Sequence, residues 1–469
     1  MPLQAFCVHG HFYQPPREDP LTGEIPLEPG AAPYRNWNER IHDQCYRPNA
    51  VLGNFEKISF NIGPTLFQWM DEYDPETVKK IIQQERQNLD QFEVGNAMAQ
   101  AYHHTILPLS PRRDKMTQVI WGLADFEHRF GHKALGLWLP ETAVDYETLG
   151  VLADCGVQFT ILAPWQAEGD RLDNTQPYWV NLPGGNRIAI FFYNQSLSTR
   201  ISFDPGATIN ADNFVWDTLL PEFRLNGRSA ERPQMIMIAT DGELYGHHQP
   251  FRDQFLAYLM DGAVKNQPIA KTYPALWLKQ NPPHRSIAIR PETSWSCHHG
   301  VTRWEGACGC TPNSGWKAPL RQALNHVAEI IDQQYLNSLQ IYPADPWQLR
   351  HQFIHLLLGE IKIGDLIGEW IGRRLDEENE RKIQLLLTAQ YDRQRMFTSC
   401  GWYFDDFDRI EPRNNVAYAA QAVWLTYLAT GVDLNRKAID FLHPVKSWRS
   451  GLRADAVFAH YMQRAKTSQ

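Results

Sequence analysis

The sequence lacks several features that would assign it to a special class of protein. It contains no run of 18 apolar residues, so no transmembrane helix is predicted. Its first dozen residues have no basic segment followed by a long apolar one, so we expect no secretory signal and a cytoplasmic location. Lys and Arg number 45 against 53 Asp and Glu, and this net charge of -8 argues against a nucleic-acid or membrane partner.

Cysteine is scarce, and its seven copies are an odd number, which favours reduced thiols over a disulfide framework. Tryptophan, by contrast, occurs 16 times. Trp fills protein cores, and its flat face also suits a sugar ring. A length of 469 residues, 43% of them hydrophobic, is enough for a large core in two or three domains, or in one barrel with additions.

The N-terminal two-thirds alternates short apolar runs with amphipathic segments such as 74–89 and 110–130, which is typical of repeated β-α units on a parallel sheet. A closed or nearly closed barrel follows more naturally from this pattern than an open sheet. The predicted strands are seven: 4–9, 57–62, 92–98, 134–139, 158–162, 187–193 and 234–240.

After about residue 315 the apolar residues recur at helical spacing and strand signals disappear. The helical stretches are 316–339, 347–375, 376–397 and 414–431. The sequence therefore predicts an α/β barrel over 1–314 and a helical domain over 315–469.

Polar side chains stand at the carboxyl ends of three predicted strands. Glu141 ends the run GLWLP, and Asp241 follows PQMIMIAT. His9 and His11 point to one face of the first strand, because side chains alternate along a strand. In a barrel these strand ends share one open rim, so we expect one site there.

Two carboxylates that converge on one point are typical of glycosidic bond cleavage, in which one attacks the anomeric carbon and the other donates a proton. Each residue also has a structural explanation. Glu141 could begin a helix, and Asp241 with Gly242 could form a turn. His9 and His11 could be hydrogen-bonded core residues or a pair of metal ligands.

At these positions the chain resembles the family 57 glycoside hydrolases, enzymes of α-glucan chemistry that include α-amylases, 4-α-glucanotransferases and branching enzymes. The resemblance covers nearly the whole chain. It rests on four motifs: His9-x-His11 with Gln14-Pro15, the stretch 95–109, Trp138-x-Pro-Glu141, and Asp241-x-Glu243 with Tyr245, Gly246 and His247. The chain departs from the family at Phe12 and Tyr13, and at Ala97 and Met98, where many members carry a Glu.

The resemblance implies an incomplete seven-stranded (β/α) barrel followed by a helical domain that completes the active-site cleft. It implies Glu141 as nucleophile and Asp241 as general acid/base. A fifth motif is expected within 396–412. The expected substrate-binding residues are His9, His11, Gln14, Trp138, Glu243, His247, His298, Trp304, Trp402 and Asp405.

The predicted function is a retaining glycosidase that acts on α-1,4-glucan or maltooligosaccharides by hydrolysis or transglycosylation, without a cofactor. Glucanotransferase and branching activities stay open, because they differ only in how well the acceptor site excludes water. Two alternatives of other classes are a metal-dependent carbohydrate hydrolase with His9 and His11 as ligands, and a non-catalytic sugar-binding protein. No oligomeric state is predicted.

Three cysteines and two histidines crowd into one short segment: Cys297, His298, His299, Cys308 and Cys310. Such residues are typical of zinc sites, but the single residue between Cys308 and Cys310 departs from the usual two. We therefore expect a Gly- and Trp-rich loop that joins the barrel to the helices and lines the cleft, and a bound metal stays open as the alternative.

Overall fold

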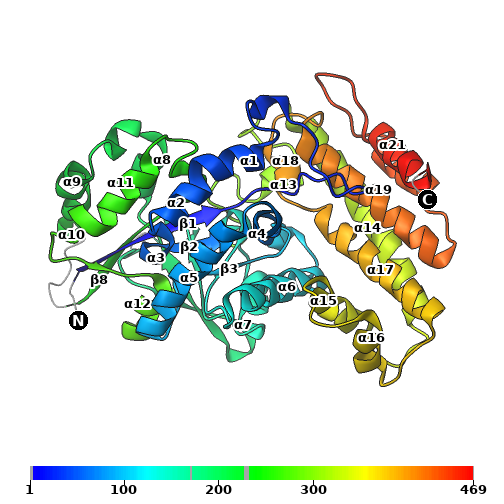
Figure 1. Cartoon of the computed structure of the whole chain (residues 1–469), viewed down its shortest axis with the longest axis horizontal. Coiled ribbons are helices and arrows are strands. Elements are labelled where there is room, and N and C mark those ends of the chain that lie inside the picture. The colour runs from blue at the N-terminus through cyan, green and yellow to red at the C-terminus, as the bar shows by residue number, and fades with distance from the viewer. Residues whose placement is uncertain (1–3, 170–171, 226–231, 468–469) are drawn as a thin grey trace. The chain divides into compact units, whose positions relative to one another are not determined.

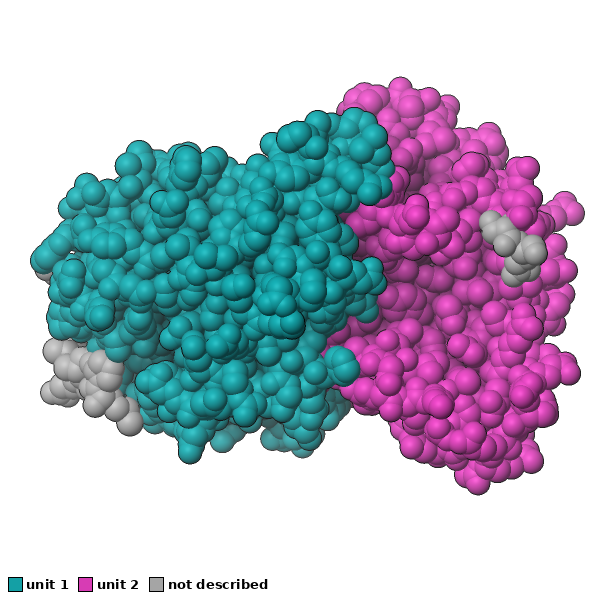
Figure 2. Space-filling view, viewed as in Figure 1, with its two compact units in different colours: residues 1–14, 27–101, 126–295 teal, residues 15–26, 102–125, 296–469 magenta. Residues whose placement is uncertain are grey.

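The computed structural model describes residues 4–169, 172–225 and 232–467 and is a mixed α/β structure (Figure 1). Its contacts divide the chain into two compact units (Figure 2). Unit 1 comprises Met1–Gln14, Leu27–Ala101 and Phe126–Trp295. Unit 2 comprises Pro15–Pro26, Tyr102–Asp125 and Ser296–Gln469. No described helix has the length and apolar character needed to cross a membrane.

All named strands lie in unit 1. They are β1 (Gln4–Phe12), β2 (Ser59–Ile62), β3 (Ala99–Gln100), β4 (Leu137–Trp138), β5 (Phe159–Leu162), β6 (Tyr178–Asn181), β7 (Arg187–Phe192), β8 (Gln234–Asp241) and β9 (Ala270–Lys271). β1 pairs in parallel with β2, β8 and β9, β3 with β4, and β5 with β7, while β6 is antiparallel to β7. Single parallel bridges, Phe60 to Ala97 and Gly136 to Phe159, connect these sheets.

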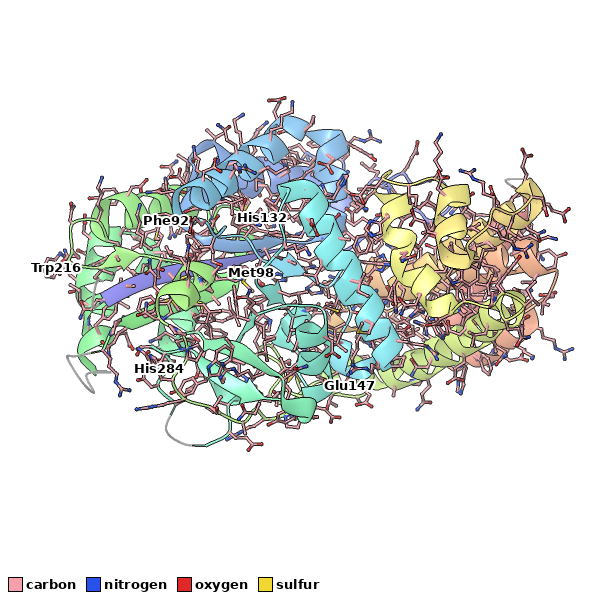
Figure 3. All side chains as sticks on the ribbon, turned by 90° about the horizontal axis from the view of Figure 1, so that it is seen from below. Phe92, Met98, His132, Glu147, Trp216 and His284 are labelled. Atoms are coloured by element: carbon pink, nitrogen blue, oxygen red, sulfur yellow. The ribbon has the colours of Figure 1, made fainter. Side chains whose placement is uncertain are left out.

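Alternate residues of these strands fill one apolar core. It includes Ala5, Cys7, Phe159, Ile161, Ala189, Phe191, Met235, Met237 and Ala239. Continuing the same alternation toward the carboxyl ends brings His9 and His11 in β1 and Asp241 in β8 to the same side. The polar residues therefore follow directly on the core side chains. Figure 3 shows Met98 among the interior side chains and Trp216, which is 58% exposed, at the periphery.

Helices connect the strands of unit 1. They are α1 (Trp37–Ile41), α2 (Arg47–Val51), α3 (Asn54–Lys57), α4 (Pro64–Tyr73), α5 (Pro75–Phe92), α7 (Tyr146–Asp154), α8 (Gln195–Phe203), α9 (Ala211–Phe214), α10 (Leu220–Leu225), α11 (Arg252–Tyr258) and α12 (Pro274–Gln280). The start of α5 follows from its sequence, because the Asp74 side chain accepts a hydrogen bond from the Thr77 N–H and Pro75 takes the first helical position.

Six of the seven predicted strands overlap β1, β2, β4, β5, β7 and β8. The prediction of a strand over 92–98 was wrong, since α5 continues to Phe92 and β3 is only Ala99–Gln100. α5 ends with Glu93 in the left-handed conformation, at φ 62°, where glycine is the usual signal. Because residue 93 is not a glycine, the sequence does not mark the end of the helix, and the apolar residues of 92–98 resemble a strand. β6 and β9 were not predicted.

Unit 2 is helical, as the spacing of apolar residues predicts. Its helices are α13 (Thr302–Glu305), α14 (Lys317–Leu339), α15 (Pro346–Leu357), α16 (Ile363–Ile371), α17 (Glu377–Arg395), α18 (Cys400–Tyr403), α19 (Ile410–Thr430), α20 (Asn435–Leu442) and α21 (Ala454–Thr467). The first part of α6 (Arg112–Phe130) also belongs to this unit.

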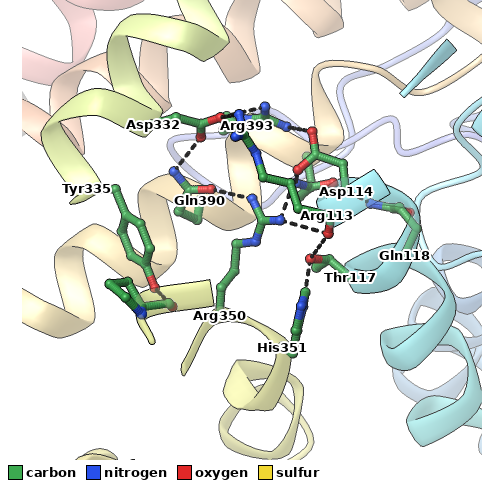
Figure 4. Close-up of polar contacts among 12 residues, drawn as sticks. Arg113, Asp114, Thr117, Gln118, Asp332, Tyr335, Arg350, His351, Gln390 and Arg393 are labelled. Carbon is green, nitrogen blue, oxygen red and sulfur yellow. Dashed lines mark hydrogen bonds and ion pairs between the residues drawn. The ribbon is translucent and has the colours of Figure 1, made fainter. Parts of the chain in front are cut away.

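A buried ion-pair network joins α6 to the helices of unit 2 (Figure 4). Asp114 of α6 lies 2.9 Å from Arg350 of α15 and 2.5 Å from Arg393 of α17. Arg393 also pairs with Asp332 of α14 at 2.8 Å. Burial acts to raise the pKa of Asp114, but the two arginines outweigh it and hold that pKa at about 2. These contacts explain why 102–125 packs with the helices rather than with the strands.

Replacing Asp114 by Ala should lower the free energy of unfolding by about 3–5 kcal/mol, because it leaves buried arginine charges without their shared carboxylate. Urea unfolding followed by circular dichroism measures the change. Glu378→Ala removes an exposed partner of Lys382 on α17 and should have a far smaller effect. Equal effects of the two substitutions would contradict a stabilising role for the network.

Candidate active site

One row of polar and aromatic side chains crosses five strands near their carboxyl ends. In the sheet register, His11 of β1 lies opposite Asp241 of β8 and Asn61 of β2. Gln100 of β3 lies opposite Trp138 of β4. The Asn61 amide donates a hydrogen bond to Gln100 Oε1 at 2.7 Å and thereby connects the two sheets. Parallel pairing aligns Asp241, His11 and Asn61 with one another and, separately, Gln100 with Trp138, and the bond between Asn61 and Gln100 joins the two groups.

The two histidines of β1 are buried and held by hydrogen bonds. His9 Nδ1 lies 2.9 Å from Ser59 Oγ, and His9 Nε2 lies 3.1 Å from Asn61 Oδ1. His11 Nδ1 contacts the same Asn61 amide. Burial lowers the pKa of each histidine to about 3. Both imidazoles are therefore neutral across the pH range in which most enzymes work.

Trp138 packs against both histidines. Its ring stacks on His9 with centroids 4.7 Å apart and on His11 at 5.1 Å. Trp295 meets Trp138 edge-on at 5.1 Å. Trp138 is fully buried, and its indole N–H has no hydrogen-bond partner among the residues described. The aromatic rings thus fix the orientation of the two imidazoles.

Glu141 occupies an unfavourable backbone conformation directly after β4. Its φ is 57°, and Thr142, a β-branched residue, follows at φ 49°. Gln166 stabilises the turn, since it accepts a hydrogen bond from Thr142 Oγ1 and donates one to the Thr142 carbonyl, both at 2.8 Å. Backbone strain of this kind clusters at functional sites, where the surrounding structure over-determines it.

Trp295 holds Glu141 at two points. Its backbone N–H donates to the Glu141 carbonyl at 3.0 Å, and its indole N–H donates to Glu141 Oε2 at 3.0 Å. Trp295 therefore orients the Glu141 side chain.

Asp241 ends β8 and remains accessible to solvent. The surrounding protein nevertheless desolvates its carboxyl group and raises its pKa to about 7. The negative charge of Glu141 is the second cause. The two carboxyl groups therefore interact electrostatically, and at neutral pH Asp241 is poised between its protonated and ionised forms while Glu141 carries a charge.

Glu243 is a buried carboxyl group that follows β8, two residues after Asp241. It accepts hydrogen bonds from the Tyr13 backbone N–H at 3.0 Å and from the Tyr46 hydroxyl at 2.7 Å. Desolvation raises its pKa to about 8 despite the bond from Tyr46. These contacts fasten the segment after β1 to the segment after β8, and the expectation that Glu243 binds substrate stays a prediction.

Gln14 and His247 also lie in unit 1. Gln14 is buried, and its carbonyl accepts a hydrogen bond from Thr65 Oγ1 at 2.8 Å. His247 is partly buried, with Nδ1 2.7 Å from Gln44 Oε1. Burial lowers the pKa of His247 to about 4, so this imidazole is neutral as well.

The other four predicted site residues lie in unit 2. Trp304 and Trp402 are fully buried, and the Arg321 guanidinium lies 3.8 Å above the Trp402 ring. In this structure neither ring presents a free face for stacking. His298 is exposed, and Asp405 pairs with Arg449 at 2.6 Å.

Sequence reasoning missed Asn61, Gln100 and Trp295. Asn61 carried a detectable signal, because it is an amide inside the short apolar strand SFNI. Gln100 lies within the motif stretch 95–109 but was not singled out there, and Trp295 carried no signal; the relevance of each depends on a contact, of Gln100 with Asn61 and of Trp295 with Glu141.

Two families match the chain. Residues 25–290 match glycosyl hydrolase family 57, and residues 313–468 match a domain of unknown function, DUF3536. The first match covers more than half of the chain. The chain belongs to glycosyl hydrolase family 57.

Curated relatives of this family 57 chain are distant. It is 24% identical over 172 residues to an α-amylase of Pyrococcus abyssi, covering 36% of this chain and 25% of the relative. It is 23% identical over 269 residues to a 4-α-glucanotransferase of Thermococcus litoralis, covering 55% of this chain and 38% of the relative. The chain thus spans about a quarter to two-fifths of the length of these relatives.

Solved structures resemble this family 57 chain over nearly its whole length. An exo-type maltose-forming amylase from Pyrococcus sp. ST04 superposes with a TM-score of 0.76 at 14% identity, covering 97% of this chain and 88% of the other. A family 57 branching enzyme from Pyrococcus horikoshii superposes with a TM-score of 0.65 at 13% identity, covering 98% of this chain and 97% of the other. At such identities these likenesses show a shared fold.

The raised pKa of Asp241 predicts a pH-dependent effect of Asp241→Asn on stability. The folded protein binds this proton more tightly than the unfolded chain, whose pKa is near 3.8. Asp241 therefore destabilises the folded state increasingly as pH rises from 3.8 toward 7, whereas Asn cannot ionise. The melting temperature of the variant should match wild type near pH 4 and exceed it above pH 7, as measured by calorimetry. A difference that is constant with pH would contradict the raised pKa.

Proposed function

We propose that this chain is a retaining enzyme of α-1,4-glucan chemistry, with Glu141 as nucleophile and Asp241 as general acid/base. The observation that carries the proposal is the raised pKa of Asp241 beside the charge of Glu141. One ionised and one protonatable carboxyl group are what retaining glycoside cleavage requires. The named α-amylase and 4-α-glucanotransferase relatives support an α-glucan or maltooligosaccharide substrate.

In the first step the Glu141 carboxylate attacks C1 of the bound glucosyl unit. The bond from C1 to the glycosidic oxygen breaks, and Asp241 gives its proton to that oxygen. The product is a glycosyl ester of Glu141. The Trp295 indole N–H, which bonds to one oxygen of Glu141, keeps the attacking carboxylate in a fixed orientation.

In the second step Asp241 acts as a base. Esterification removes the charge of Glu141, and with it one of the two causes that raise the pKa of Asp241. Its carboxylate then takes a proton from water or from a sugar hydroxyl, whose oxygen attacks C1 and releases Glu141. Water gives hydrolysis and a sugar gives transfer. Two inversions at C1 leave the configuration retained.

The neutral histidines suit a sugar ligand. His11 is adjacent to Asp241 in the sheet register, and its imidazole can donate to or accept from a hydroxyl group without adding charge. We propose that His11 contacts the glucosyl unit. Trp138, which stacks on both His9 and His11, keeps the His11 imidazole in position.

The fold that we propose is an incomplete seven-stranded (β/α) barrel over 1–314 followed by a helical domain over 315–469. The parallel order β8-β1-β2, the β3-β4 and β5-β7 pairs and the single bridges between them support the barrel. The family matches, which end at residue 290 and begin again at 313, support the division, whereas the contacts assign 15–26, 102–125 and 296–314 to unit 2.

A metal-dependent hydrolase with His9 and His11 as ligands fits the contacts less well. Both ring nitrogens of His9 already have hydrogen-bond partners, Ser59 and Asn61, so neither is free for a metal. Among the described residues, the one group of three or more metal-ligating side chains lies elsewhere, at Cys297–Cys310.

Glu141→Gln should lower kcat on maltooligosaccharides by several orders of magnitude, and Asp241→Asn by about 10²–10⁴-fold. An activated aryl maltoside, such as the 2,4-dinitrophenyl glycoside, separates their roles, because its phenolate leaves without needing a proton. With that substrate Asp241→Asn should still form the glycosyl ester and accumulate it, and intact-protein mass spectrometry should detect the added mass. Glu141→Gln should form none.

Glu147→Gln is the matched control, because this exposed glutamate lies only six positions along the chain, in α7. It should keep wild-type turnover. Wild-type activity in folded Glu141→Gln or Asp241→Asn would end the assignment. Separating products from amylose by size and linkage then distinguishes hydrolysis from chain transfer and from branching.

The pH dependence of kcat/KM should decline on its alkaline side with an apparent pKa near 7, since Asp241 must be protonated to assist the leaving group. Initial rates on a maltooligosaccharide across a buffer series measure it. On an aryl maltoside this alkaline decline should shift or disappear. An identical alkaline limb with both substrates would indicate that another group sets it.

A further inference from the structure

We propose that Cys297, His299, Cys308 and Cys310 form a structural zinc site. One ligand atom from each of the four side chains lies within 4.8 Å of all the others. All four residues belong to unit 2 and to the short segment between α12 and α14. The inference is independent of the proposed catalytic function.

The distances fit one tetrahedrally coordinated ion. Cys297 Sγ lies 3.4 Å from Cys308 Sγ and 3.8 Å from Cys310 Sγ. His299 Nδ1 lies 3.3 Å from Cys308 Sγ and 3.4 Å from Cys310 Sγ. Zn–S bonds of about 2.3 Å and Zn–N bonds of about 2.0–2.1 Å give tetrahedral edges of about 3.8 Å between sulfurs and about 3.6 Å between sulfur and nitrogen.

The same distances exclude a disulfide as the structure stands, because an S–S bond measures about 2.05 Å. The ligand set is three thiols and one imidazole, which is a common combination for structural zinc. Four protein ligands leave no open coordination position for water or substrate. We therefore infer a structural ion rather than a catalytic one.

The backbone holds the ligands on two tight turns. The Gly300 N–H donates to the Cys297 carbonyl, and the Thr311 N–H donates to the Cys308 carbonyl, both at 3.1 Å. The Cys308 N–H also donates to Ser314 Oγ at 3.0 Å. These bonds bring Cys308 and Cys310 together even though only Gly309 separates them. The single-residue spacing of Cys308 and Cys310, which departs from the usual two, is therefore compatible with shared coordination.

A buried cation beside the cluster is consistent with an anionic metal centre. Lys317 is fully buried, and its Nζ has no hydrogen-bond partner among the described residues. Burial lowers its pKa to about 8, and the charge of Arg303 contributes to this lowering, while the three cysteines are near enough to oppose both effects. Three thiolates and one divalent ion carry a net charge of -1, which would compensate the charge of Lys317.

The position of the site suggests what it stabilises. The segment falls between the two family matches, at 25–290 and 313–468, and belongs to neither. Along the chain it begins two residues after Trp295, the residue that donates to Glu141. A bound ion would restrict this connection by cross-linking both of its turns.

Elemental analysis of purified protein, grown in zinc-supplemented medium and freed of any affinity tag, should find about one zinc per chain. His299→Ala should lose most of this zinc. The matched control is His298→Ala, because His298 is the adjacent exposed histidine outside the cluster and its replacement should leave the zinc content unchanged.

Cobalt substitution of the wild-type chain provides a second measurement if His299→Ala fails to fold. The Co²⁺ protein should show thiolate-to-cobalt charge-transfer bands and the intense visible absorption of a tetrahedral site. Three results would overturn the proposal: less than about a tenth of an equivalent of metal in the wild type, equal metal in the His299 and His298 variants, or a Cys297–Cys308 disulfide in protein kept under reducing conditions.

Discussion

The parallel register of β8, β1 and β2 is the constraint on which the rest of the site depends. It puts Asp241, His11 and Asn61 at one level, on the face that the core side chains fill further back along the strands. A slip of one residue in any of these strands would turn its polar side chain to the opposite face. The apolar core fixes this register, because only one alignment buries the alternate apolar residues.

The carboxyl groups of Glu141, Asp241 and Glu243 lie in different electrostatic environments, although they are chemically similar. Glu141 and Asp241 are both carboxyl groups, yet Glu141 accepts a hydrogen bond from the Trp295 indole, while desolvation and the charge of Glu141 raise the pKa of Asp241 to about 7. Glu243, two residues from Asp241, is buried and accepts a hydrogen bond from the Tyr46 hydroxyl. Asp241 and Glu243 both have raised pKa values, and Asp241 differs from Glu243 in being accessible to solvent and in having Glu141 as a charged neighbour.

The helical unit uses polar groups in another way. Asp114 and Asp332 compensate buried arginines and fix α6 against α14, α15 and α17. The four candidate zinc ligands concentrate further polarity at the connection between the family matches. In both places charged groups specify which segments pack together, a role that apolar contacts fulfil less selectively.

The sequence by itself determined the strand and helix periodicity, the change to helices after about residue 315 and the motifs around Glu141 and Asp241, because these depend on local spacing and residue type. It missed the end of α5 at Glu93, where a non-glycine residue adopts the left-handed conformation. Only the tertiary structure decided that Trp295 contacts Glu141, that 102–125 packs with the helices, and that His299 rather than His298 joins the three cysteines. Each of those outcomes depends on contacts between segments distant in sequence or on side-chain direction, and neither is encoded in local periodicity.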